Sequence, residues 1–465
     1  MHRRRFLASA AAAMAAGTVP LRPYRAAALD LAGTAHLKMP PLLDTTATGR
    51  LQLAAMAGQH SYGGPGTTPS AGFSQPYLGP TIRMANGPLA AEIENTLSDP
   101  VSVHWHGLMV PGQHDGGPLL PVLPGQRWTP EMQIGQDPAT VWYHSHIHGQ
   151  TAPQVYAGLA GVIQLTDGRD DQRGLPSDYG TDDLTLVLQD RRFDAAGRAI
   201  YDPGMMDIMH GFAGNAMTVN GQTNTTAVVP QGIVRLRLLN GSNARVYSLF
   251  FEDNRPMHLV ATDSGYLPAP IALQGLTLAP GERAELLVDF AGAATATLLS
   301  DPGGSFVVQD FATDDSLTPR ITRLPETFDS APDDLTGTEI RTRKLSLDMG
   351  MGGMMGGGFA INGQPYDMQR IDFEVPLGSV ERWIVRSTMM AHPFHIHGVR
   401  FRVLSENGAA PRPENTGWKD TTLVSGETEI IARFDQPASR DKPFMFHCHI
   451  LEHEDAGMMG QFAVV

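Results

Sequence analysis

The sequence predicts an all-β protein built from three Greek-key β-sandwich domains. The chain has 465 residues, enough for two to four domains of ordinary size. Its 50 glycines and 35 prolines are dispersed among short runs rich in Val, Ile and Leu, and only 18% of its residues are charged. This composition is typical of a turn-rich β protein rather than of a helix bundle.

A weak internal repeat gives the number of domains. Three segments each run from a glycine turn into a polar residue and then a strand-like stretch: "LPGQRWTPEMQI" (123–134), "LAPGERAELLVDF" (278–290) and "LVSGETEIIARF" (423–434). Self-similarity at so long a period indicates a repeated β domain. We expect domains at 36–167, 182–312 and 338–465, with the Pro- and Asp-rich segment 313–337 as a linker. Strand candidates within them are 140–149, 185–190, 233–240, 381–387 and 444–450.

The N-terminal residues 1–28 predict a signal peptide. Arg3, Arg4 and Arg5 precede an Ala-rich apolar run, and small residues follow up to Ala28. The pattern "RRRFL" is typical of a twin-arginine signal, which implies export of a folded protein to the periplasm or beyond. A membrane anchor is the alternative, but the apolar run is short and is interrupted at Gly17. We therefore expect an exported protein without a membrane span after processing.

Charge and cysteine content narrow the function classes. Removal of residues 1–28 takes away five arginines and no acid, so the formal net charge of −14 becomes more negative. An acidic surface argues against nucleic acid and anionic membranes as partners. A single cysteine, Cys448, excludes an intrachain disulfide and leaves core filler, a reactive thiol or a metal ligand.

Four His-x-His pairs are the strongest functional signal. Two lie in the first expected domain, two in the third and none in the second: His104/His106, His144/His146, His395/His397 and His447/His449. On a β-strand, residues two apart point to the same face, so each pair directs two imidazoles the same way. One pair alone is weak evidence for metal binding, but four pairs in this distribution predict a metal centre between the first and third domains.

The donor types around Cys448 predict copper. Imidazole, thiolate and thioether donors together suit copper better than hard cations or structural zinc. Cys448 is followed by His453 and Met458, and His392 is the candidate for a second histidine. One Cys, two His and a weak axial Met make a blue-copper electron-transfer site. Cys448 points to the face of its strand opposite His447 and His449, so the strand should connect this copper to a second metal centre.

With "HWHG", "HSHIHG", "HPFHIHG" and "HCHILEHEDAGM", the sequence resembles the three-domain multicopper oxidases, which include laccases, bilirubin oxidases and bacterial copper-efflux cuprous oxidases. The resemblance implies cupredoxin-like domains and four copper ions. It implies one-electron oxidation of a donor at a type 1 copper and four-electron reduction of dioxygen to water at a trinuclear cluster. The implied ligands are His392, Cys448, His453 and Met458 for type 1, His104 and His395 for type 2, and His106, His144, His146, His397, His447 and His449 for the type 3 pair.

Two acids match family positions for proton delivery. They are Asp115 in "PGQHDGGP" and Glu454, which directly follows His453. The alternatives are a turn-forming carboxylate at Asp115 and a solvated loop acid at Glu454. His148, third in "HSHIHG", has no ligand role in the family, so we expect it to be structural.

The electron donor stays open between Cu(I) and phenol-like or aromatic amine compounds. Thioethers are soft donors that bind Cu(I), and the candidate substrate ligands are Met349, Met351, Met354, Met355 and Met390. The alternative for the Met- and Gly-rich segment is a flexible loop without a role in copper binding. The copper-efflux oxidases that the chain resembles carry a much longer Met-rich insertion, and Thr388 stands where their aspartate is expected.

Two further function classes compete with an oxidase. One is a scaffold on the same fold, like the copper-free division proteins related to these oxidases, which have lost ligands that this chain keeps. The other is a protein that sequesters copper through its methionines without turnover. The expected oxidase would act as a monomer, with a role in copper tolerance.

Overall fold

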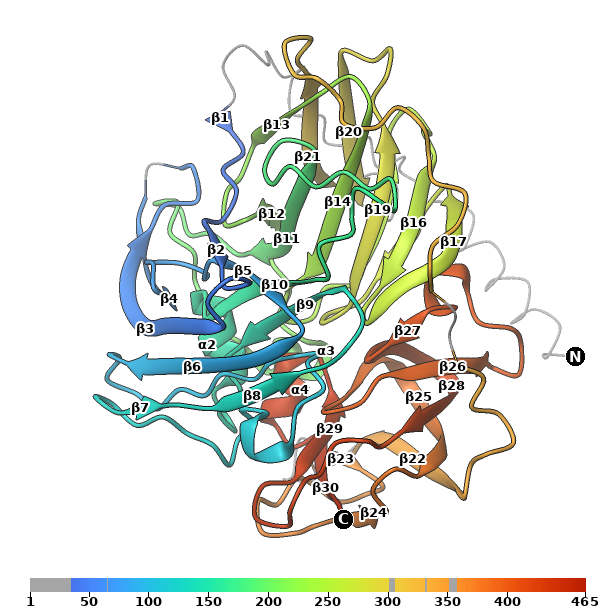
Figure 1. Cartoon of the computed structure of the whole chain (residues 1–465). Coiled ribbons are helices and arrows are strands. Elements are labelled where there is room, and N and C mark those ends of the chain that lie inside the picture. Colours follow the sequence, from blue (N-terminus) through green and yellow to red (C-terminus); the bar gives the residue numbers. More distant parts are fainter. Residues whose placement is uncertain (1–34, 65, 301–305, 331–332, 351–357) are drawn as a thin grey trace, which may run out of the picture.

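The computed structural model describes residues 35–64, 66–300, 306–330, 333–350 and 358–465. Its strands form three groups that pack around a common centre (Figure 1). The groups follow one another along the chain, except that the first strand, Ala35–His36, pairs within the second group. The signal peptide and the methionines Met351, Met354 and Met355 lie outside the described residues. Among the helices of the described residues, none is long and apolar enough to cross a membrane.

The first group of strands forms two sheets around one apolar core. One sheet has the order β2-β5-β10-β9, and the other has β4-β3-β6-β7 with β8 paired to β6. The strands are β2 (Leu42–Asp44), β3 (Arg50–His60), β4 (Thr68–Phe73), β5 (Thr81–Ala85), β6 (Gly87–Asn95), β7 (Arg127–Trp128), β8 (Glu131–Ile134), β9 (Ala139–His144) and β10 (Ala160–Thr166). The expected strand at 140–149 ends at His144, and helix α2 (Thr151–Ala157) follows.

The second group also forms two sheets, β1-β13-β21-β20-β15-β18 and β12-β11-β14-β19-β16-β17. Its strands are β1 (Ala35–His36), β11 (Asp183–Arg191), β12 (Ala216–Val219), β13 (Thr225–Val229), β14 (Ile233–Asn240), β15 (Tyr247–Phe251), β16 (Met257–Thr262), β17 (Gly265–Leu273), β18 (Leu276–Leu278), β19 (Arg283–Asp289), β20 (Thr295–Ser300) and β21 (Phe306–Thr313). Helix α3 (Met205–His210) lies between β11 and β12.

Strands β14 and β19 are buried on both faces. Val234, Leu236 and Leu238 of β14 lie in the core of the second group, whereas the alternate positions Arg235 and Arg237 are buried outside that core. The period of two in side-chain direction explains this division. The outer face of this sheet is therefore an interface, and its buried arginines pair with carboxylates such as Glu285 of β19.

The third group is a nine-stranded sheet in which seven strands follow the path β24-β30-β29-β25-β28-β26-β27, while β22 pairs with β25 and β23 pairs with β22. The strands are β22 (Arg341–Met349), β23 (Phe359–Ile361), β24 (Phe373–Val375), β25 (Val380–Ile396), β26 (Phe401–Glu406), β27 (Trp418–Lys419), β28 (Thr421–Arg433), β29 (Phe444–Cys448) and β30 (Met459–Val464). The expected strand at 444–450 ends at Cys448, and helix α4 (Leu451–Asp455) follows.

One sequence expectation in this group is wrong. Gly426 was expected to form a turn before a strand, but β28 runs through it without a break. Gly426 has a φ of 88° and pairs with Ser387, at the point where the register of β25 shifts before His392. The glycine therefore marks an irregularity of the ladder rather than a turn.

The three groups meet where the short helices lie. Helix α4 contacts both α2 and α3, so residues of all three groups converge there (Figure 1). The segment between β21 and β22 forms neither helix nor strand in its described part, and Arg173 holds it through Asp329 at 2.7 Å.

Candidate metal centre

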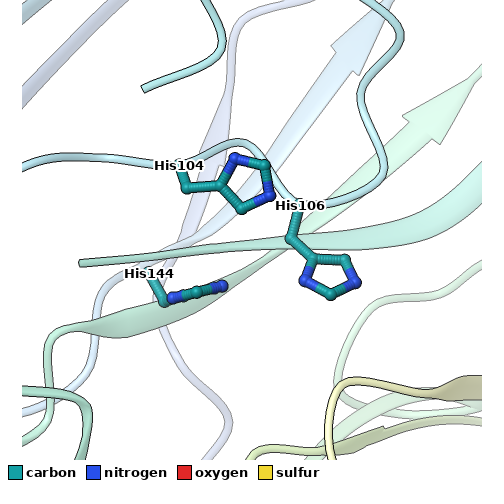
Figure 2. A group of neighbouring side chains, drawn as sticks. All are labelled: His104, His106 and His144. Atoms are coloured by element: carbon teal, nitrogen blue, oxygen red, sulfur yellow. The ribbon is translucent and has the colours of Figure 1, made fainter. Parts of the chain in front are cut away.

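The first two histidine pairs lie side by side because their backbones pair. His104 forms an isolated β-bridge with His144, with N–H to carbonyl distances of 2.9 and 3.1 Å. Figure 2 shows His104, His106 and His144 grouped where the loop carrying the first two runs beside the strand carrying the third. Within the four pairs the ring centroids are 5.0–5.7 Å apart, so both members of each pair lie on the same side.

All eight paired histidines converge on one buried volume between the first and third groups of strands. Each is at most 1% exposed. Ring nitrogens from different segments approach closely: His104 Nε2 lies 3.4 Å from His395 Nε2, and His397 Nε2 lies 3.1 Å from His447 Nε2. A third contact joins His146 Nε2 and His447 Nε2 at 3.3 Å. We call these eight residues the histidine cluster.

The second nitrogens of these rings show how the cluster is oriented. His104 Nδ1 donates to the carbonyl of Asp115 and His144 Nδ1 donates to that of Ser145, which leaves Nε2 of both rings as an acceptor facing inward. His106 is reversed, because its Nε2 contacts Asp420 and its Nδ1 has no partner. His144 Nε2 and both nitrogens of His449 are also buried without a hydrogen bond. Buried nitrogens without partners are costly, and metal coordination would satisfy them.

Burial lowers the pKa of seven of the clustered histidines, so these seven are neutral at physiological pH. For His447 it lowers the pKa to about 3. At six other positions the neighbouring imidazoles lower the pKa further, because a protonated imidazole would repel a second protonated imidazole beside it. These positions are His106, His144, His146, His395, His397 and His449. Neutral imidazole is the form that binds metal ions.

Cys448, His392 and His453 form a second, smaller group. Cys448 Sγ lies 3.3 Å from His392 Nδ1 and 3.7 Å from His453 Nδ1, and the two Nδ1 atoms are 3.2 Å apart. Burial lowers the pKa of His392 to about 4 and of His453 to about 3. His453 Nε2 contacts the carbonyl of Met209 at 3.3 Å, so its Nδ1 is free to face Cys448.

Met458 is held beside this group by the backbone. It is fully buried in the core of the third group, its N–H donates to the carbonyl of His453, and its carbonyl accepts from the N–H of Cys448. Burial raises the pKa of the Cys448 thiol, while the N–H of Ile450 donates to its sulfur at 3.4 Å. The donor set of one thiolate, two imidazoles and a nearby thioether fits copper.

The extended segment at the end of β29, from His447 to His449, separates the two groups as the predicted alternation requires. His447 and His449 belong to the histidine cluster, and Cys448 between them faces His392 and His453. A single peptide bond on each side therefore connects Cys448 to a ligand candidate of the cluster.

Asp115 lies inside the cluster rather than in a solvated turn. It is 1% exposed, and its Oδ2 accepts from His397 Nδ1 at 2.7 Å. Its Oδ1 is buried without a partner. The following Gly116 has a φ of 80°, and a Cβ there would lie 1.7 Å from the carbonyl oxygen of Val103, so glycine is required for this close approach.

Glu454 lies on the other side of the cluster. Its two carboxyl oxygens are 3.3 Å from His146 Nδ1 and 3.2 Å from His447 Nδ1, and it is 1% exposed. Burial raises the pKa of Glu454 well above its usual range, and the neighbouring Asp455 raises it further. The carboxyl group therefore keeps its proton to a higher pH than an exposed glutamate does.

Sequence reasoning missed several residues that contact the two groups. Asp420 Oδ1 lies 2.9 Å from His106 Nε2, and Trp142 stacks on His144 with ring centroids 4.2 Å apart. Phe359 stacks on His453 at 4.3 Å. Their neighbours in space are distant in sequence, so periodicity could not reveal them; the one available signal was the position of Trp142 two residues before His144.

The methionine candidates are only partly described. Met349 and Met390 are partly buried and pack against the core of the third group. Met389, Met205 and Met206 are 63–65% exposed. His148 lies outside the cluster, exposed and edge-on to Tyr366 at 4.9 Å.

The three β domains and the buried imidazole and thiolate groups define a protein of the multicopper oxidase type. Family models described as multicopper oxidase match residues 56–170, 177–297 and 341–465. The chain belongs to the multicopper oxidase family, with cupredoxin-like domains.

Among solved structures, the chain is similar to a laccase-like multicopper oxidase, CueO, from Ochrobactrum sp., with 43% identity and a TM-score of 0.88, covering 92% of this chain and 100% of that one. It is also similar to McoA from Aquifex aeolicus, with 30% identity, a TM-score of 0.83, and coverage of 93% and 99%. The Ochrobactrum protein is described as having oxidase activity towards lignin model compounds and lignosulfonate.

Curated relatives carry a different name. Cell division protein FtsP of Escherichia coli K12 is 38% identical over 100% of this chain and 99% of that protein. FtsP of Xenorhabdus nematophila is 37% identical over 100% and 98%. The chain is thus similar both to proteins named as oxidases and to proteins named for cell division.

Proposed function

We propose that this chain is an exported multicopper oxidase that couples one-electron oxidation of a donor to the four-electron reduction of dioxygen to water. The observation that carries the proposal is the set of eight buried histidines, among which ring nitrogens from different segments approach to 3.1–3.4 Å, beside a separate Cys-His-His group that includes Cys448, the residue between His447 and His449. A protein that used its fold only as a scaffold would have no need to bury so many unpartnered imidazole nitrogens.

The donor set supports four copper ions. His392, Cys448, His453 and Met458 would hold a type 1 copper. His104 and His395 would hold a type 2 copper, and the type 3 pair would be held by His106, His144, His146, His397, His447 and His449. The unpartnered nitrogens indicate that His106 would bind through Nδ1 and His144 through Nε2.

Copper held by these residues would supply the redox chemistry, namely one-electron oxidation of the donor at the type 1 site and four-electron reduction of dioxygen at the cluster. The residues supply position and protons. The peptide bonds on either side of Cys448 give a short path from this residue to His447 and His449. Asp115 holds His397 through Nδ1, and Glu454 lies at 3.2 Å from His447 Nδ1.

The two carboxyl groups are suited to proton delivery. Reduction of dioxygen to water consumes protons, and both acids are buried in contact with cluster histidines. Burial raises the pKa of Glu454, which favours its protonated form and so suits it to donate a proton where water is excluded.

For the donor we propose Cu(I), phenol-like compounds or aromatic amines, with a role in copper tolerance. Met349 and Met390 are candidate Cu(I) ligands among the described residues, and Met351, Met354 and Met355 complete the segment in sequence. Residues 1–28 would direct export as a twin-arginine signal, and the mature protein would be a monomer.

Oxygen uptake tests the proposal. Purified, copper-loaded protein should consume oxygen with Cu(I), with a phenolic donor, or with both. If residues 349–358 deliver Cu(I), a variant lacking them should no longer consume oxygen with Cu(I) but should still consume it with the phenolic donor. Absence of oxygen uptake with either donor, in protein that contains copper, would refute the oxidase.

A second candidate function is a role in cell division, favoured by the 36–38% identity to curated relatives of that name over nearly the whole chain. The two functions are separable. A Cys448→Ser variant that restores division in a strain lacking this protein would assign division to the fold and not to the oxidase.

A further inference from the structure

The second group of strands contributes no histidine to the cluster, yet Arg283 of β19 reaches its edge. Arg283 lies on the outer face of its strand, where alternate positions point away from the core of the second group. It is fully buried. We infer that Arg283 is a positioning residue: it fixes the carboxylate of Asp420, which in turn holds His106 with Nδ1 towards the cluster.

Every N–H of the Arg283 guanidinium has a partner. Nη1 and Nη2 donate to the two carboxylate oxygens of Asp420 at 2.8 and 2.5 Å. The other three donors go to main-chain carbonyl oxygens: Nη1 to Gly281 at 2.8 Å, Nη2 to Asp263 at 2.9 Å and Nε to Thr140 at 3.1 Å. A planar fork with five donors can make this arrangement, and an ammonium group cannot.

Asp420 transmits this position to two histidines. It is fully buried, and its Oδ1 faces His106 Nε2 at 2.9 Å while its main-chain carbonyl accepts from His395 Nδ1 at 2.8 Å. Thr421 Oγ1 donates to the same Oδ1 at 2.9 Å. The rings of His106 and His395 are stacked at 3.6 Å, so a shift of the carboxylate would move both.

The glycine of "HWHG" gives an independent sign that this contact is built into the site. Gly107 has a φ of 92°, and a Cβ there would lie 2.7 Å from Asp420 Oδ2 and 2.8 Å from Arg283 Nη2. A larger residue after His106 would push the arginine–aspartate pair away. The glycine of "HWHG" in the first domain therefore leaves space for the Arg283 side chain of the second domain.

The rival explanation is that Arg283 only joins domains. Arg237 of β14 provides the matched control, because it is also buried on the outer face of this sheet. It pairs with Asp183 at 2.6 Å and with Glu285 at 3.0 Å, and it donates to Thr140 Oγ1 at 3.1 Å. None of these partners is Asp420 or a histidine.

The test compares Arg283→Lys with Arg237→Lys in the full-length protein. The inference rests on the proposed function only because copper is taken as the metal. The copper content of the wild-type protein is therefore measured in the same experiment. In Arg283→Lys, competition titration with a copper chelator should show copper affinity at the cluster falling about 10- to 100-fold. The electron paramagnetic resonance signal of type 2 copper should change, because Asp420 also holds His395, the proposed type 2 ligand. The blue absorption per chain should stay as in the wild type. Arg237→Lys should match wild type in both.

Unchanged affinity and resonance signal in Arg283→Lys, or equal losses in both variants, would overturn the inference. If Arg283→Lys does not fold, nitrogen-15 NMR of the metal-free wild-type protein decides. His106 should carry its proton on Nε2, whereas His104 and His144 carry it on Nδ1; a proton on Nδ1 of His106 would overturn it. Wild-type protein that binds no copper would instead refute the proposed function.

Discussion

Replacement of Glu452 by alanine should destabilise the protein strongly, because this carboxylate attaches helix α4 to the second group of strands. Glu452 is 2% exposed. Its Oε1 accepts from Tyr201 Oη at 3.0 Å and Asn243 Nδ2 at 2.8 Å, and its Oε2 accepts from the N–H of Phe212 at 3.0 Å. The same helix carries His453 and Glu454, so the attachment also holds both candidate sites in place.

The magnitude follows from the donors left behind. Asn243 and Phe212 are at most 2% exposed, and each would lose an acceptor that water cannot easily replace. A buried donor without a partner costs about 1–3 kcal/mol, so Glu452→Ala should cost about 2–6 kcal/mol. With about 2 °C per kcal/mol for a chain of this size, the melting temperature should fall by at least about 4 °C.

Thermal unfolding of the metal-free protein measures this effect. Glu452→Gln, which keeps one carbonyl oxygen, should fall between the wild type and Glu452→Ala. Alanine at the exposed Glu326 serves as the control and should leave the melting temperature unchanged. A Glu452→Ala protein that melts within about 1 °C of the wild type would refute the hydrogen-bonding argument.

Three further predictions concern the candidate sites. Cys448→Ser should abolish the blue absorption and donor oxidation while copper at the histidine cluster persists, and loss of all copper would contradict the separation of the two groups. Asp115→Asn should reduce turnover about 10²- to 10⁴-fold at full copper content, measured by oxygen uptake, and unchanged turnover would remove it from proton delivery. Because burial raises the pKa of Glu454, its carboxyl group should lose its proton only at a pH above the ordinary range of glutamate. In a pH series of infrared spectra, a protonated carboxyl band should therefore persist above that range and be absent in Glu454→Gln.

Much of the fold could be predicted from local patterns. The strand expected at 233–240 coincides with β14, because a run of alternating Val and Leu with a period of two is a local signal. Gly426 lies within a long strand instead of the expected turn, because a single glycine looks the same in sequence in a turn and in an irregularity of a strand.

The candidate site also has a part that the sequence predicts and a part that it does not. The four His-x-His pairs were visible because a spacing of two residues is local in the sequence, although in the structure none of the pairs lies wholly within a strand. The contact of Asp420 with His106, and the pairing of Arg283 with Asp420, join residues 314 and 137 positions apart. Such contacts depend on how three domains pack, and nothing in a strand pattern encodes them.

The most direct test of the central claim is the copper content of the purified chain, measured by mass spectrometry of the metal together with the blue absorption and oxygen uptake of the same sample. We predict four copper ions per chain, an intense blue colour that depends on Cys448, and oxygen consumption with a donor. A protein folded as described that binds no copper under loading conditions would contradict this claim.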